Sequence, residues 1–125
     1  MRVFKPVVVA AFLLVPSVAF AGEMKITVLY HQPKSAEEFD KYFSKHMPMV
    51  YAVKEMKKVE VARPMPGPTG APSPYHIVTE LWFDSPDVMK TTTATPEWKA
   101  IIDDVPKFAA ADGVTVIVSE VEPKR

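Results

Sequence analysis

The sequence predicts one α+β domain, in which a four-stranded antiparallel sheet carries helices on one face. Three observations lead to this fold class. Four short β-branched and apolar segments alternate with helix-like segments in the order βαββαβ. Each helix-like segment opens with a side chain that can cap it. The third and fourth strand segments carry apolar residues on both faces, which indicates that both faces of the sheet are covered.

The first 21 residues are expected to be a signal peptide. Two basic residues precede an almost wholly apolar run over 7–20, and the Ala-Phe-Ala sequence at 19–21 has the small residues of a cleavage site. The run contains Pro16 and is shorter than the roughly 20 residues of a membrane span. A retained N-terminal anchor is the alternative. We expect residues 22–125 to form the mature domain, periplasmic or secreted, with no membrane association after cleavage.

The composition argues against several classes of function. Fifteen basic residues balance 15 acidic ones, so the excess of positive charge typical of a nucleic-acid binder is absent. The chain has no cysteine, which excludes disulfides, thiolate zinc sites and a cysteine nucleophile. Its three histidines are scattered, and the sequence motifs of serine hydrolases, P-loops and dinucleotide sites are missing. We therefore expect neither a metal nor a cofactor.

The first strand is expected over 24–31, where β-branched residues partly alternate with others. Ser35 and Glu38 then have the spacing of a capping box, so a helix should follow. Four side chains share one face of this helix at positions i, i+3, i+4 and i+7: Phe39, Tyr42, Phe43 and His46. Pro48 disfavours helical geometry at the residue before it, so we expect a break or a kink there.

Three further strands are expected, over 59–63, 75–83 and 114–119. Between the first two lies the low-complexity segment 64–74, with five prolines and two glycines in eleven residues. Prolines lack the backbone donor that a strand or helix interior needs, so this segment should be a stiff surface loop. A ligand for a proline-recognition domain is the alternative, although no repeat or basic flank supports it.

Two helical segments should separate the last two strands. Ser85-Pro86 and Thr95-Pro96 each place a capping side chain before a proline, which is the arrangement favoured at a helix start. The second segment should end at Pro106. Its apolar face comprises Trp98, Ile101, Ile102 and Val105.

This order of elements is that of a ferredoxin-like subunit. Helices cover only one face of such a sheet, so a second copy of the chain is the economical cover for the other apolar face. On the third strand, Tyr75, Ile77 and Thr79 should face the helices, because that side carries no charge. His76 and Glu80 should then lie at the contact between subunits, where a buried Glu80 needs His76 or a lysine of the other subunit as its partner.

Several segments, taken in order, resemble the EthD family. They are residues 28–30, 39–48 with its His46-Met47-Pro48 ending, 75–85, 95–98 and 113–116. The resemblance implies a dimeric α+β barrel, in which two ferredoxin-like sheets pack face to face, and a pocket between sheet and helices in each subunit. The sequence departs from the family where Lys54-Glu55-Met56 replaces the usual Pro-Gly, and the expected signal peptide is also unusual for it.

The resemblance leaves the reaction open. Relatives across the superfamily include cofactor-free monooxygenases, polyketide cyclases, lactone isomerases and haem-degrading enzymes.

His46 is the strongest candidate for a catalytic residue. An imidazole near the end of the first helix, on its aromatic face, is suited to act as general acid or base at a pocket rim. The resemblance implies a place in the pocket, because the matching histidine of the family's His-x-Pro motif is a recurrent pocket residue. The alternative is a histidine that caps helix carbonyls. His76 is either a haem or flavin contact or a packing residue, and His31 should be solvated.

Five aromatic residues are expected to line an apolar pocket, or else to belong to an aromatic core: Tyr30, Tyr42, Tyr75, Trp98 and Phe108. Such a pocket fits a small apolar or aromatic carbonyl compound, with Tyr30 or Tyr75 orienting its oxygen. The resulting hypothesis is a cofactor-free enzyme of the oxidoreductase (monooxygenase-like) or isomerase/cyclase type. The alternative is a non-catalytic binding or accessory protein.

Overall fold

The computed structural model of the protein describes residues 22–124. The predicted signal peptide over 1–21 lies outside the described residues. The regular elements are β1 (Met24–His31), α2 (Ala36–Tyr51), β2 (Lys58–Ala62), β3 (Tyr75–Phe83), α3 (Pro86–Thr93), α4 (Pro96–Asp104) and β4 (Val114–Glu120). Within this part of the chain, no helix combines the length and the apolar character that crossing a membrane requires.

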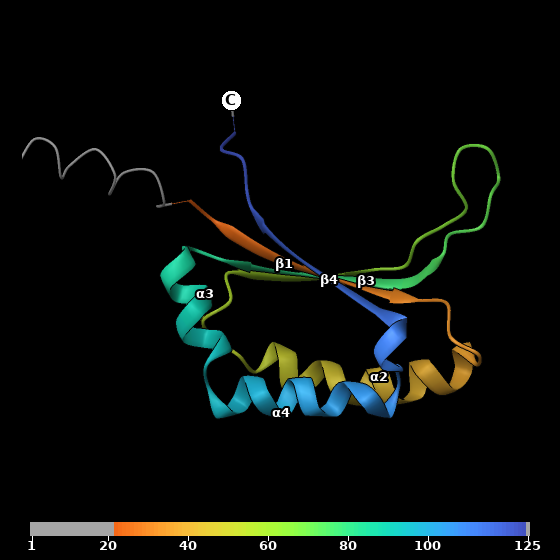
Figure 1. The fold of residues 1–125 in the computed structure, drawn as a ribbon, viewed down its shortest axis with the longest axis horizontal. Helices are drawn as coiled ribbons and strands as arrows, with labels where there is room; N and C mark the ends of the chain where they lie inside the picture. Colours follow the sequence, from red (N-terminus) through yellow and green to blue (C-terminus); the bar gives the residue numbers. More distant parts are fainter. Residues whose placement is uncertain (1–21, 125) are drawn as a thin grey trace, which may run out of the picture.

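The four strands form one antiparallel sheet in the order β2-β3-β1-β4. Figure 1 shows α2, α3 and α4 on one side of this sheet, with α2 and α4 next to each other. Among the described elements, none covers the other side. The predicted α+β fold class, with a ferredoxin-like βαββαβ subunit and its helices on one face, is confirmed.

The core lies between the sheet and the helices. From Ile77 to Phe83 the odd-numbered residues of β3 are buried, and the even-numbered ones are half-buried. The buried apolar residues of β3 belong to one cluster with Phe39, Phe43 and Val50 of α2. The placement of Ile77 on the helix side is therefore as predicted.

The opposite face of the sheet mixes apolar and charged side chains. Glu80 forms an ion pair there with Lys25 of β1, with 2.8 Å between Oε2 and Nζ. The expectation that His76 or a lysine of a second subunit pairs with Glu80 is wrong, because the adjacent strand of the same chain supplies the cation. The ring of Trp82 lies on the same face, with the ammonium groups of Lys25 and Lys58 5.4 and 4.5 Å from its centroid.

The helix starts follow the prediction. Ser35, Ser85 and Thr95 each accept a hydrogen bond from the backbone N–H three residues further on, which caps α2, α3 and α4 respectively.

Of the break or kink expected at Pro48, the break is wrong, because α2 continues through the proline to Tyr51. A proline in a helix leaves the carbonyl of the residue four positions earlier without its usual donor. That carbonyl belongs to Ser44, which is exposed, so water can hydrate it. The buried residues of α2 on both sides of the proline, Phe43 and Val50 among them, keep the helix packed on the sheet.

A β-bulge at the start of β3 changes the predicted orientation of His76. Tyr30 pairs with Ile77 and His31 pairs with Tyr75, so His76 is an extra residue between two paired ones. Its Nε2 lies 2.9 Å from Oδ1 of Asp40 on α2. The prediction that His76 lies at a contact between subunits is therefore wrong, and it packs against the helix instead.

His31 is not solvated as predicted. Its Nε2 lies 2.8 Å from the hydroxyl oxygen of Thr115 on β4. The ring of Tyr75 packs edge-on against it, with 5.5 Å between the centroids. Strand pairing brings these three half-buried side chains together. The sequence alone does not show which side chains this pairing places beside His31.

Candidate functional site

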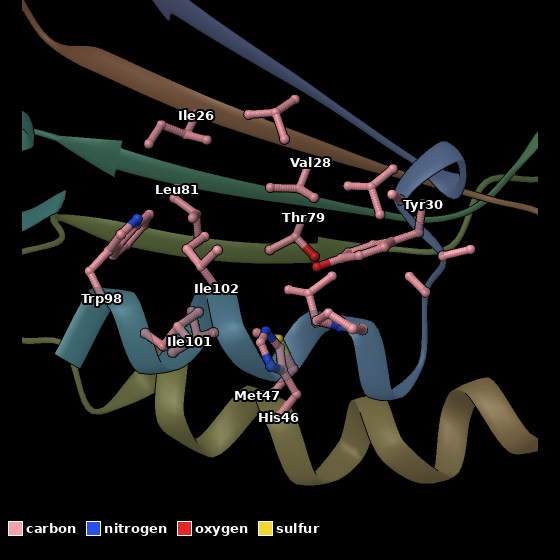
Figure 2. Close-up of a pocket in the computed structure, with 18 residues that line it drawn as sticks. Ile26, Val28, Tyr30, His46, Met47, Thr79, Leu81, Trp98, Ile101 and Ile102 are labelled. Atoms are coloured by element: carbon pink, nitrogen blue, oxygen red, sulfur yellow. The ribbon is translucent and has the colours of Figure 1, made fainter. Parts of the chain in front are cut away.

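A cavity of about 480 Å³ lies between the sheet and the helices α2 and α4 (Figure 2). Its lining is almost entirely apolar and contains no lysine, arginine, aspartate or glutamate from the described chain. The lining residues are Ile26, Val28, Tyr30, His46, Met47, Val50, Thr79, Leu81, Trp98, Ile101, Ile102, Val105, Pro106, Ala109, Ala110, Ala111, Val114 and Val116. A lining of this kind suits an apolar compound with few polar groups.

His46 is buried in the cavity wall and is hydrogen-bonded to a carboxylate. Only 2% of the residue is exposed, and its Nδ1 lies 2.8 Å from Oδ2 of Asp104, the last residue of α4. The other carboxylate oxygen of Asp104 is 2.9 Å from Nζ of Lys107. This forms a chain of three polar groups, from the exposed lysine through the carboxylate to the buried imidazole.

The charge on Asp104 determines which nitrogen of His46 carries the proton. The hydrogen bond from Lys107, and then the one from His46, lower the pKa of Asp104 below its ordinary value, so it is a carboxylate at neutral pH. A carboxylate only accepts hydrogen bonds, so Nδ1 of His46 must donate. Nε2 of neutral His46 then keeps its lone pair, and no described residue hydrogen-bonds this atom. The geometry is that of a base oriented by a carboxylate.

Aromatic rings hold His46 in place. The ring of Phe108 meets it edge-on at 4.9 Å between centroids, and the ring of Phe43 stacks beside it at 6.2 Å. Figure 2 shows His46 and Met47 extending from α2 toward the cavity. Because two aromatic rings pack against the imidazole and Asp104 holds its Nδ1, its orientation is fixed before any ligand binds.

Two residues that line the same cavity carry hydroxyl groups. Tyr30 is 4% exposed, and burial raises the pKa of its phenol to about 12, so it is a neutral hydrogen-bonding group at physiological pH. Thr79 is also 4% exposed, and its Oγ1 is buried with no hydrogen-bond partner among the described residues. Figure 2 shows the phenol of Tyr30 pointing toward Thr79.

The sequence-predicted site residues separate into two groups. His46, Tyr30 and Trp98 line the cavity. Phe108 lies behind the wall, in contact with the rings of Tyr30 and His46.

The other two predicted residues lie elsewhere. Tyr42 is on the outside of α2, where the ammonium groups of Lys41 and Lys45 lie 5.6 and 5.7 Å from its ring centroid. Tyr75 packs against His31, away from the cavity lining.

Sequence reasoning missed Asp104, and it noted Thr79 only as a residue facing the helices. Asp104 is 58 positions from His46 and lies in an acidic pair, Asp103-Asp104, that resembles an ordinary solvated helix end. Thr79 is an unremarkable residue in a strand. Residues 22–124 contain no group of three or more histidine, aspartate or glutamate side chains placed to bind a metal ion.

Three solved structures share the fold at low sequence identity. SnoaB, a cofactor-independent oxygenase from Streptomyces nogalater, has a TM-score of 0.61 at 10% identity, over 83% of this chain and 97% of that one. A hydroxynitrile lyase from Passiflora edulis has a TM-score of 0.64 at 12% identity, over 84% of this chain and 98% of that one. A dimeric ferredoxin-like protein from Bacteroides fragilis has a TM-score of 0.59 at 19% identity, over 82% of this chain and 99% of that one. At this identity the likeness shows the fold alone.

Closer relatives indicate the family. An uncharacterised 11.0 kDa protein of Rhodococcus erythropolis, from the thcB–thcC intergenic region, is 27% identical over 99 residues, which are 78% of this chain and 94% of that protein. An EthD family protein from Bacillus halodurans has a TM-score of 0.73 at 28% identity, over 80% of this chain and 99% of that one. The EthD domain profile matches residues 31–112, which include both His46 and Asp104. Since this match spans more than half of the chain, the protein belongs to the EthD family.

Proposed function

We propose that this protein is an enzyme that moves a proton on a small apolar or aromatic compound bound in the cavity, with His46 as acid and base. One observation carries this proposal: His46, buried in the wall of an otherwise apolar cavity, is hydrogen-bonded to the carboxylate of Asp104. An apolar wall with one oriented base is an arrangement suited to general acid–base catalysis.

The reaction would begin with transfer of a substrate proton to Nε2 of His46. The carboxylate of Asp104 stabilises the imidazolium that forms, while the electron pair of the broken bond remains on the substrate. The neutral phenol of Tyr30 donates a hydrogen bond to the oxygen on which that negative charge collects. Return of the proton to another atom of the substrate completes an isomerisation. In a cyclisation, the anion instead attacks a carbonyl carbon of the same molecule, and the proton passes to the alkoxide that forms. In the oxidative alternative, molecular oxygen takes two electrons from the anion and, with the proton from His46, gives a hydroperoxide, which loses water to leave a carbonyl group.

The fold relatives support a catalytic use of the cavity. One of them is described as a cofactor-independent oxygenase and another as a hydroxynitrile lyase. We also propose that the chain is exported and that it works as a homodimer. The basic and apolar start of the sequence supports export, and the dimeric ferredoxin-like relatives support self-association.

The test is proton exchange on a simple aromatic ketone. The protein is incubated with 1-indanone in D₂O, and deuterium uptake at the carbon next to the carbonyl is followed by NMR. We expect the protein to accelerate the exchange, and His46→Ala to reduce that acceleration by about 100-fold or more. His31→Ala is the matched control, since this histidine lies outside the cavity lining. Saturable binding of the ketone without deuterium uptake would contradict catalysis and favour the binding or accessory protein.

A further inference from the structure

The hydroxyl of Thr79 is the one buried side-chain oxygen or nitrogen in the described chain that has no hydrogen-bond partner. It lies in the middle of β3, on the face that lines the cavity. An unpaired hydroxyl in an apolar wall is destabilising relative to a paired one. An unsatisfied group of this kind calls for an explanation, and a bound ligand provides one.

The position itself does not require a hydroxyl. Valine has the same branched shape as threonine and a similar preference for strands. Its neighbours on this face of the sheet, Val28 of β1 and Val61 of β2, are both valines. A third valine would complete an apolar wall, so packing alone does not explain the oxygen at residue 79.

The charges around the cavity limit what can bind there. No cationic side chain lines the wall to neutralise an anion. The carboxylate of Asp104 lies behind His46, and it disfavours a second negative charge. An ionised ligand would lose its hydration without gaining a partner, so the cavity selects uncharged molecules.

The side chains of Tyr30 and Thr79 place their hydroxyl groups close together on the sheet wall. Tyr30 pairs with Ile77, so Thr79 is its diagonal neighbour on the adjacent strand and on the same face. Figure 2 shows the two oxygen atoms near the middle of the lining, with Trp98 and Ile26 at one end of it. A ligand with its oxygen at Thr79 and its apolar body toward Trp98 would match this arrangement.

We propose that the cavity binds an uncharged, largely apolar compound that carries a single hydroxyl or carbonyl oxygen, and that Thr79 is the residue that recognises this oxygen. The inference rests on the proposed function in that it takes the cavity as the substrate site. It adds the chemical class of the substrate and a residue that determines specificity.

Matched probes test this inference without any turnover. N-phenyl-1-naphthylamine, whose fluorescence rises in apolar surroundings, reports occupancy of the cavity. Naphthalene and 2-naphthol, which differ by one hydroxyl, are then used to displace it, and 2-naphthoate serves as the anionic counterpart. Wild type is compared with Thr79→Val, which removes the hydroxyl and keeps the shape, and with Thr79→Ser, which keeps the hydroxyl.

We expect wild type to bind 2-naphthol at least about tenfold more tightly than naphthalene or 2-naphthoate, as one well-placed hydrogen bond predicts. Thr79→Val should lose this preference, keep its affinity for naphthalene within about twofold, and show no lower Tm. Thr79→Ser should keep the preference.

The inference would be overturned if Thr79→Val changed the affinities for naphthalene and 2-naphthol equally, or changed neither. The cavity would then still be a ligand site. Failure of every probe to bind wild type would overturn both the inference and the use of the cavity. A result in which the probes bind as expected but His46→Ala leaves 1-indanone exchange unchanged would remove the catalytic role alone. The two proposals therefore fail separately.

Discussion

At the scale of single residues, the site depends on one carboxylate that serves two partners. Asp104 accepts a hydrogen bond from Lys107 with one oxygen and from His46 with the other. Its side chain is only 13% exposed, so solvent weakens these interactions much less than it weakens a surface ion pair. The orientation of the imidazole and the charge state of the carboxyl are thus two consequences of the same contacts.

Replacing Asp104 by asparagine should lower stability in a pH-dependent way. The pKa of Asp104 in the folded protein lies below its ordinary value of 3.8, so its contribution is fully present above that value and is lost as the pH falls through the folded pKa. We expect Asp104→Asn to reduce the free energy of unfolding by about 1–2 kcal/mol at pH 7. The difference from wild type should shrink below about pH 4. Urea unfolding at several pH values measures it.

The neighbouring Asp103 is the control for this prediction. It pairs with Lys99 one turn earlier in α4, and both side chains are mostly exposed. Asp103→Asn should therefore change stability by no more than about 0.5 kcal/mol. A loss from Asp104→Asn that is equally small, or that stays constant down to pH 3, would show that the carboxylate does not hold His46.

At the scale of the elements, local signals were sufficient for most of the fold. Capping side chains and β-branched runs located the helix starts and the strands, because the interactions that form them lie within a few residues. The cavity was predicted from the sequence less completely than the fold. The bulge that turns His76 toward α2 and the pairing of His46 with Asp104 depend on the register between strands and on the packing of α4 against α2. Neither leaves a pattern along the chain.

Pro48 shows how packing overrides a local signal, and this can be measured. Alanine at this position restores a backbone donor for the carbonyl of Ser44 and removes the ring from the interior of α2. The unfolded chain gains freedom, which offsets part of the benefit. We expect Pro48→Ala to raise the free energy of unfolding by about 1 kcal/mol, as measured by urea unfolding.

A loop proline separates the two effects. Pro66 is exposed in the segment between β2 and β3, so Pro66→Ala changes the freedom of the unfolded chain and restores no helix bond. It should leave stability unchanged or lower it by up to about 1 kcal/mol. If Pro48→Ala and Pro66→Ala lower the free energy of unfolding equally, Pro48 does not destabilise α2.

At the scale of the whole molecule, the sheet has one face covered by helices and one that is not. Val78 and Trp82 of β3 lie on the uncovered face, where Leu29 of the adjacent strand β1 is the pairing partner of Val78. Charged side chains on this face form pairs within the chain, among them Lys25 and Glu80. A face with paired charges and apolar side chains between them is suited to meet a second copy of itself across a two-fold axis.

A charge placed in the middle of this face should therefore separate the proposed dimer. We expect light scattering to give wild type twice the mass of one chain at micromolar concentration. Val78→Arg should have the mass of one chain, because two arginines would meet near the symmetry axis without partners. Lys99→Glu on the exposed side of α4 is the control and should remain dimeric.

Since Val78 points away from the cavity, a Val78→Arg monomer that still binds N-phenyl-1-naphthylamine would show that each subunit builds its own site. A wild-type monomer would refute the dimer and leave the uncovered face unexplained.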